Sequence, residues 1–179
     1  MSKHNGLANP ADLEPFDSDK EHLLHVVIET PKGSRNKFAF NPKHHVFELK
    51  RVLPAGMAFP YDFGFVPSTR AEDGDPVDVL VLMDEPAFPG CLLKCRPIGV
   101  IEGEQKEDKK KIRNDRIVAI EQDAHSWADI RKLADIGEDF NQELQRFFEN
   151  YHNLSGQKYR VIGMKGPKPA IELVKSSLI

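Results

Sequence analysis

The stretch Glu72–Met83, EDGDPVDVLVLM, decides how the rest of the chain is interpreted. Three carboxylates, those of Asp73, Asp75 and Asp78, fall within six residues and lead directly into an apolar run that is typical of a buried β-strand. Two carboxylates about 4 Å apart repel by on the order of 1–4 kcal/mol, and a divalent cation would remove that cost. Oxygen ligands suit Mg²⁺, with Mn²⁺ as the alternative. Taken alone, the stretch is equally compatible with an acidic turn that binds no metal.

Two other ion-binding or phosphate-binding motifs are excluded. An EF-hand needs oxygen ligands at loop positions 1, 3 and 5, Gly at position 6 and Glu at position 12. Counting from Asp73 places Val77 at position 5, Asp78 at position 6 and Asp84 at position 12. The chain also has no glycine-rich phosphate loop of the GxxxxGK[ST] type, so a P-loop nucleotide hydrolase is not supported.

Segments with strand character lie on both sides of the acidic stretch. They are Leu23–Glu29, Asn36–Phe40, Val46–Leu49, Asp78–Met83, Cys91–Ile101, Ile117–Ile120 and Lys158–Met164. Leu53–Pro67, which holds four aromatic residues between prolines and glycines, is expected to be an irregular loop covering the core. Glu102–Arg116 is so rich in charge that we expect much of it to form a solvated hairpin tip.

One long helix is predicted near the C-terminal end. The apolar side chains of Glu138–Leu154 recur at helical spacing, and Pro169–Ser177 is expected to form a short helix. Strands therefore come first and do not alternate with helices. This order favours a mainly β fold with α: a small, mostly antiparallel closed barrel with one long and one or more short helices packed outside it. A doubly wound parallel sheet is not favoured.

Length and composition predict one domain, 1–179, with 1–21 as a loose N-terminal leader. A net charge of −3 gives no general attraction to nucleic acid or to an anionic membrane, so neither is expected as a partner. No signal-peptide core and no run of 18 apolar residues occurs, and we expect a cytoplasmic protein. Cys91 and Cys95 are interpreted as small buried side chains in a reducing compartment.

The run DGDPVDVLVL resembles the signature of the soluble family I inorganic pyrophosphatases, Asp-x-Asp-Pro-x-Asp followed by an apolar strand. The resemblance continues in family order through VVIETPKGSRNKF, FPYDFGFVP, CRPIGVI, NDRIVAI and FFENY, from about Val26 to Tyr159. It implies a five-stranded OB-like closed barrel with added helices and Mg²⁺-dependent hydrolysis of pyrophosphate. It also implies a homo-oligomer, which is a hexamer in the bacterial relatives that this chain resembles.

The resemblance implies a role for each residue at a matching position. Metal would be bound by the carboxylates of Asp73, Asp75, Asp78 and Asp115. Substrate phosphates would be bound by Lys37, Arg51, Arg116, Tyr151, His152 and Lys158. Asp75 would also accept a proton from the attacking water, and Glu29 would be an outer acidic member of the site. Together, Asp75, Lys37, Arg51 and Tyr151 are the residues expected to carry the catalysis.

The sequence also departs from the family pattern. Ala39 replaces an acidic residue, Phe59 and Phe63 replace tyrosines, and Arg116 and His152 replace lysines. Of two metal-binding aspartates of the family, one corresponds to Asn114, with Asp115 beside it, and the other lies near Gln105 or a neighbour. These changes remove negative charge and two hydroxyl groups from the expected site. Two alternatives therefore stay open: a non-catalytic homologue that binds metal or phosphate, and an enzyme that hydrolyses another small phosphoanhydride.

Overall fold

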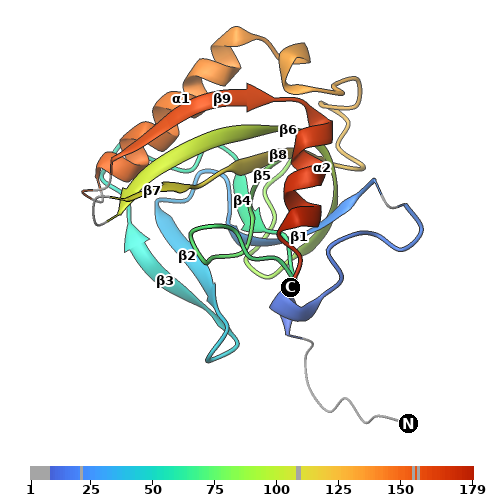
Figure 1. Cartoon of the computed structure of the whole chain (residues 1–179), viewed down its shortest axis with the longest axis horizontal. Helices are drawn as coiled ribbons and strands as arrows, with labels where there is room; N and C mark the ends of the chain where they lie inside the picture. The colour runs from blue at the N-terminus through green and yellow to red at the C-terminus, as the bar shows by residue number, and fades with distance from the viewer. Residues whose placement is uncertain (1–8, 21, 108–109, 155, 157) are drawn as a thin grey trace.

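In the part of the chain that the structure describes, the protein is mainly β with two α-helices (Figure 1). The computed structural model describes residues 9–20, 22–107, 110–154, 156 and 158–179. Its main sheet has seven strands: β1 (Leu24–Thr30), β4 (Asp62–Phe65), β5 (Asp78–Leu82), β6 (Leu92–Glu107), β7 (Lys110–Arg113), β8 (Arg116–Glu121) and β9 (Tyr159–Lys165). A separate two-stranded sheet consists of β2 (Asn36–Asn41) and β3 (Val46–Val52). The strands predicted from the sequence are all present.

Five strands form a ring of pairings. The order β1-β4-β5-β8-β6 is completed because β1 also pairs with β6. The long strand β6 continues beyond the ring, where it pairs with β7 and β9. The pairings are antiparallel except that between β5 and β8, so the expectation of a mostly antiparallel sheet is confirmed with one parallel pair. That parallel register places Asp78 opposite Arg116.

Two helices cover the sheet from different sides (Figure 1). Helix α1 (Glu138–Asn153) packs along β9, and its apolar stripe buries Leu144 and Phe148, as the helical spacing predicts. Helix α2 (Pro167–Ser176) packs against β6 and begins with a proline in its first turn, where no backbone N–H is needed. Short 3₁₀ helices occur at Pro10–Asp12 and Leu133–Asp135.

Strand alternation divides the core into two clusters. On β5, Leu80 and Leu82 belong to the cluster that contains the α1 residue Phe148. The intervening Val79 and Val81 belong to the cluster that the α2 residues Ala170 and Val174 join. Successive side chains of a strand point to opposite faces, so this central strand is buried on both. That burial explains why DVLVL is apolar without alternation.

The expectation of an irregular loop over Leu53–Pro67 is wrong in part, because Asp62–Phe65 forms strand β4. Gly64 lies so close to β1 that an added Cβ would be 2.1 Å from the carbonyl oxygen of Val27. The aromatic side chains of Phe59 and Phe63 are buried. A four-residue strand flanked by prolines and glycines lacks the length by which sequence patterns reveal a strand.

The charge-dense segment is only partly a solvated tip. β6 runs through it to Glu107 and returns as β7; residues 108 and 109 lie outside the described residues. At the base of this hairpin, Gln105, Asn114 and Arg116 are buried. The high charge of the segment predicted exposure to solvent, and it therefore gave no indication that these three polar residues are buried.

Part of the predicted leader contacts the rest of the protein. Asp17 is buried, forms an ion pair with Lys94 on β6, and lies 3.7 Å from the ring of His25 on β1. Residues 1–8 and 21 of that leader lie outside the described residues. Within the described part of the chain, no helix has both the length and the apolar composition that crossing a membrane requires.

Candidate active site

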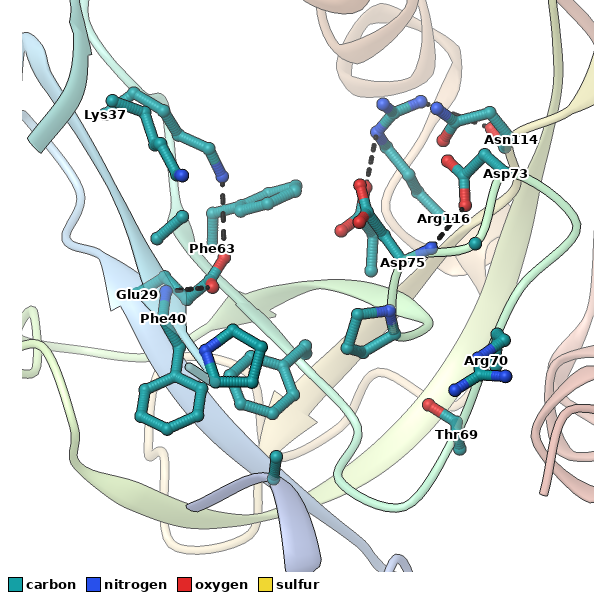
Figure 2. Close-up of a pocket in the computed structure, with 18 of the residues that line it drawn as sticks. Glu29, Lys37, Phe40, Phe63, Thr69, Arg70, Asp73, Asp75, Asn114 and Arg116 are labelled. Carbon is teal, nitrogen blue, oxygen red and sulfur yellow. Dashed lines mark hydrogen bonds and ion pairs between the residues drawn. The ribbon is translucent and has the colours of Figure 1, made fainter. Parts of the chain in front are cut away.

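A single cavity collects most of the residues that the sequence singled out. It has a volume of about 700 Å³ and lies between the β2–β3 sheet, the turn before β5, and the C-terminal part of α1 (Figure 2). Nine predicted site residues line it: Glu29, Lys37, Arg51, Asp73, Asp75, Asp78, Arg116, Tyr151 and His152. These residues come from positions as distant as 29 and 152, so the fold brings them together.

The acidic side of the cavity is formed by the turn before β5. Asp73 accepts a hydrogen bond from the backbone N–H of Asp75 at 3.2 Å, which fixes the turn. Burial, followed by the charge of Asp78, raises the pKa of Asp73 to about 6. Burial likewise raises the pKa of Asp78 to about 6, although the nearby Arg116 opposes the rise. In both cases the protein disfavours a bare negative charge, which is the condition that a bound cation relieves.

The opposite side of the cavity carries a buried ion pair (Figure 2). The Glu29 carboxylate lies 3.5 Å from the Lys37 ammonium and accepts a hydrogen bond from the backbone N–H of Phe40. Burial raises the pKa of Glu29, and Lys37 opposes that rise. The Lys37 ammonium also lies 4.0 Å from the centroid of the Phe63 ring. Phe63, at a position where the family has tyrosine, therefore contacts Lys37 through its ring.

Arg116 is the buried cation next to the acidic side. Its side chain is 3% exposed, and its Nε lies 3.6 Å from the Asp78 carboxylate. Its guanidinium is packed against the rings of Phe148 and Tyr159, at 4.5 and 4.8 Å from their centroids. Nη1 donates to the backbone carbonyl of Asn114, and Nη2 lies 2.9 Å from His152 Nε2. The group is thus held in one orientation from several sides.

An amide pair forms part of the cavity wall beside Arg116. Asn114 Nδ2 donates to Gln105 Oε1 at 2.7 Å, and both residues are buried and line the cavity. These are the two positions at or near which the family has metal-binding aspartates. Here both positions carry neutral amides, which are joined to each other by a hydrogen bond, so neither adds a negative charge beside Arg116.

Two predicted site residues lie elsewhere. Asp115 does not line the cavity; its carboxylate accepts hydrogen bonds from Arg113 and from the backbone N–H of Gly103. Successive residues of an extended chain point to opposite sides, so Asn114 faces the cavity and Asp115 faces away. Lys158 is exposed and also lies outside the cavity lining.

Other residues that line the cavity were missed by the sequence reasoning. Arg70 and Lys50 add cations, and Thr69 and Asn41 add neutral polar groups. Arg70 stands three residues before Asp73, and Lys50 is adjacent to Arg51, so proximity to the expected site residues was the available signal. An isolated arginine or lysine in a polar segment is otherwise indistinguishable from a surface residue.

The donor set suits a hard divalent cation. Asp73, Asp75 and Asp78 supply only oxygen, which is the ligation that Mg²⁺ and Mn²⁺ prefer. Burial raises the pKa of both Asp73 and Asp78 to about 6 even though Arg116 opposes the rise, so a bound cation would stabilise their charged forms. Among the described residues, no three His, Cys, Asp or Glu side chains already surround one common point. The turn therefore offers the right atoms, which would have to converge when a cation binds.

The fold and the cavity together define a class of protein. A mainly β chain carries a cavity in which carboxylates suited to a divalent cation face cations suited to phosphate. Such a site matches enzymes of phosphoryl transfer to water, in which metal and cationic side chains neutralise the phosphates.

Comparisons with known proteins give the family. The family model described as inorganic pyrophosphatase matches residues 26–178. An inorganic pyrophosphatase of Thermus thermophilus is 36% identical over 177 residues, which cover 96% of this chain and 97% of that protein. One from Synechocystis sp. is 36% identical over 156 residues, covering 87% of this chain and 90% of that protein. A crystal structure of the enzyme from Thermus thermophilus superimposes with a TM-score of 0.86 at 35% identity, covering 95% of this chain and 97% of that one. The chain belongs to the inorganic pyrophosphatase family.

Proposed function

We propose that this protein hydrolyses inorganic pyrophosphate to two phosphates in a Mg²⁺-dependent reaction at the cavity. The observation that carries the proposal is the convergence of Asp73, Asp75 and Asp78 with Lys37, Arg51 and Arg116 around one cavity. Pyrophosphate is small and highly anionic, and a cavity of about 700 Å³ accommodates it together with a cation. Membership of the family supports the same substrate.

The residues of the turn before β5 would hold the cation. Asp73, Asp75 and Asp78 supply its oxygen ligands, with Mg²⁺ preferred and Mn²⁺ as the alternative. A divalent cation at such a site lowers the pKa of water and polarises phosphoryl oxygens. We assign no metal to Asp115, because Arg113 and Gly103 already engage its carboxylate. Glu29 stays an outer acidic group that orients Lys37.

The remaining chemistry is carried by side chains of this chain. Asp75, which is exposed to the cavity, accepts a proton from the attacking water. Lys37 and Arg51 bind oxygens of the phosphate that departs, and the Tyr151 hydroxyl donates a hydrogen bond to it. Water adds to one phosphorus as the bridging P–O bond breaks, so that one pyrophosphate and one water give two phosphates without a covalent enzyme intermediate.

A second function is favoured by one specific observation. Ala39 and the Gln105–Asn114 pair remove three expected acidic groups from the cavity, which weakens its attraction for additional cations. A homologue that only binds metal or phosphate, or one that hydrolyses another small phosphoanhydride, would tolerate this loss. Phosphate release should therefore be measured on pyrophosphate, tripolyphosphate and ADP, alongside calorimetric binding of phosphate. Release from pyrophosphate in preference to the others supports the proposal, whereas binding without release, or release only from the other substrates, contradicts it.

Several broader features are part of the same proposal. We propose that residues 1–179 form one domain and that the ring of five strands is an OB-like closed barrel, which the β1–β6 pairing supports. The protein would act in the cytoplasm as a homo-oligomer, a hexamer by family resemblance, without nucleic-acid or membrane partners. Light scattering of the purified protein tests the assembly.

A further inference from the structure

We propose that His152 is a neutral hydrogen-bond acceptor that positions Arg116, and that it is not a second cation for the substrate. Arg116 alone then provides the positive charge on this wall of the cavity. The proposal rests on the proposed function for the role of Arg116 toward phosphate. The arrangement of the two side chains is independent of that function.

The contact between the two residues fixes their roles. Arg116 Nη2 lies 2.9 Å from His152 Nε2, a normal hydrogen-bond distance. A guanidinium has five N–H donors and no acceptor, so it is the donor in this contact. His152 Nε2 therefore accepts and carries no proton, and the ring proton sits on Nδ1. An imidazolium would carry a proton at Nε2 and would turn an N–H toward the arginine.

The surroundings of the pair make the arrangement rigid. His152 is 5% exposed, and its ring stacks on Tyr159 with centroids 4.4 Å apart and planes 16° apart. The same Tyr159 ring packs against the guanidinium of Arg116, and its hydroxyl donates to the carbonyl of Asn114. This packing requires Gly103, where an added Cβ would lie 2.0 Å from the Tyr159 hydroxyl oxygen. The tyrosine thus fixes both partners of the hydrogen bond.

The orientation imposed on Arg116 turns its Nε toward the acidic side of the cavity. Nη1 and Nη2 are used by Asn114 and His152, whereas no described residue accepts a hydrogen bond from Nε. This Nε lies 3.6 Å from the Asp78 carboxylate, at the acidic side of the cavity. A buried donor without an acceptor is costly, so a phosphate oxygen or a shifted Asp78 that reaches it gains a hydrogen bond. By its hydrogen bond to Nη2, His152 positions the guanidinium so that Nε points toward the Asp78 carboxylate.

The two departures from the family pattern are therefore coupled. A lysine at position 152 would bring a second cation to within hydrogen-bond distance of a buried guanidinium, where like charges repel strongly. A histidine that accepts a hydrogen bond removes this conflict. We infer that Arg116 requires a neutral residue at position 152. A lysine at position 116 would not require one, because its side chain is slimmer and more flexible and can move away from a second cation.

A double-mutant cycle tests the coupling. His152→Lys is made in the native chain and in the Arg116→Lys background, with His152→Gln as the conservative variant that keeps an acceptor. His125→Lys is the matched control, because the His125 side chain is 97% exposed and lies away from the cavity. The measurements are kcat and KM for Mg²⁺-pyrophosphate, thermal unfolding, and ¹⁵N spectra of the imidazoles at neutral pH, with His152 assigned by its loss in His152→Gln.

The expected outcomes are specific to a positioning role. In the native chain, His152→Lys lowers kcat/KM about tenfold or more and lowers the unfolding temperature. In the Arg116→Lys background, the same substitution lowers kcat/KM less than about threefold. His152→Gln stays within about threefold of the native protein, His125→Lys is unchanged, and the spectrum shows an unprotonated Nε2. An imidazolium spectrum, an equal cost in both backgrounds, or a gain in kcat/KM for His152→Lys would overturn the inference. If the native protein releases no phosphate while the spectrum and the unfolding results are as expected, the inference stands and the proposed function is contradicted.

Discussion

Replacing Asp78 by asparagine should make the metal-free protein more stable while removing its response to metal. The Asp78 side chain is 24% exposed, and burial raises its pKa from an ordinary 3.8 to about 6. The folded protein therefore binds a proton here more readily than the unfolded chain does. The stability of the folded protein falls as the pH rises through the window from about 4 to about 6. Above this window, the full destabilisation from the ionised Asp78 carboxylate is present. Asparagine resembles the protonated acid and avoids that cost.

The magnitude follows from the pKa. The difference between 3.8 and about 6 corresponds to about 3 kcal/mol, because one unit of pKa is about 1.4 kcal/mol. Solvent that reaches the partly exposed carboxylate screens the effect, so we expect about 1–2 kcal/mol. For a chain of this size that is a rise in Tm of about 2–8 °C. In the native protein a saturating cation would offset the cost, since a ligand at 100 times its Kd stabilises by about 2.7 kcal/mol.

The assay is thermal unfolding of native protein and Asp78→Asn at about pH 8 and about pH 4, each with EDTA and with Mg²⁺. With EDTA at about pH 8 the variant should unfold at the higher temperature, and at about pH 4 the difference should vanish. Mg²⁺ should raise the Tm of the native protein and leave the variant unchanged. A variant that is less stable than native protein in EDTA at about pH 8 would refute the assignment of burial as the dominant effect on Asp78.

Three further predictions concern other parts of the site and the fold. Phe63→Leu should raise KM about threefold to fivefold, because the Phe63 ring lies 4.0 Å from the Lys37 ammonium and supplies a cation–π contact. Phe63→Tyr keeps the ring, so its KM should stay near the native value; steady-state kinetics checks both. Gly64→Ala should lower stability by more than about 2 kcal/mol, measured by urea unfolding, because its Cβ would meet the Val27 carbonyl 2.1 Å away. Mg²⁺ affinity should weaken as the pH falls through about 6, where Asp73 takes up a proton in competition with the cation; calorimetry at several pH values would show a constant affinity if this is wrong.

The strands and the long helix were predictable because their patterns are regular. Glu138–Leu154 has helical spacing over more than four turns, and α1 spans Glu138–Asn153. The apolar run after Asp78 is β5 as expected. Strand β4 was missed because four residues between prolines and glycines carry no periodicity. The parallel pairing of β5 with β8 depends on contacts between distant segments, which no local pattern encodes.

The site was predictable only as far as its residue types were distinctive. Three closely spaced carboxylates in front of a strand indicated a candidate cation site from the residues alone, although an acidic turn that binds no metal was an equally good interpretation. Lys37, Arg51 and Tyr151 entered only through the family resemblance, since single cations and tyrosines are common on surfaces. Asn114 faces the cavity and Asp115 faces away from it, because successive side chains of an extended chain point to opposite sides. The sequence did not reveal this difference, because the charged segment made the alignment with the family uncertain there.

The role that we propose for His152 illustrates what three-dimensional contacts add to an aligned position. The resemblance placed a substrate-binding group there, because the family has lysine. The contact with Arg116 Nη2 at 2.9 Å and the stacking on Tyr159 indicate a different role. Sequence comparison records which residue replaces a lysine, whereas the donor and acceptor geometry determines what the replacement does.

The most direct test of the central claim is phosphate release from pyrophosphate by the purified protein, with Mg²⁺, with EDTA, and with the Asp75→Asn variant. We expect release that requires the metal and is lost in Asp75→Asn, while circular dichroism shows that the variant is folded. Activity that persists in folded Asp75→Asn would contradict the assignment of Asp75 as the proton acceptor. Absence of release from the folded native protein with Mg²⁺ would contradict the proposed enzyme itself.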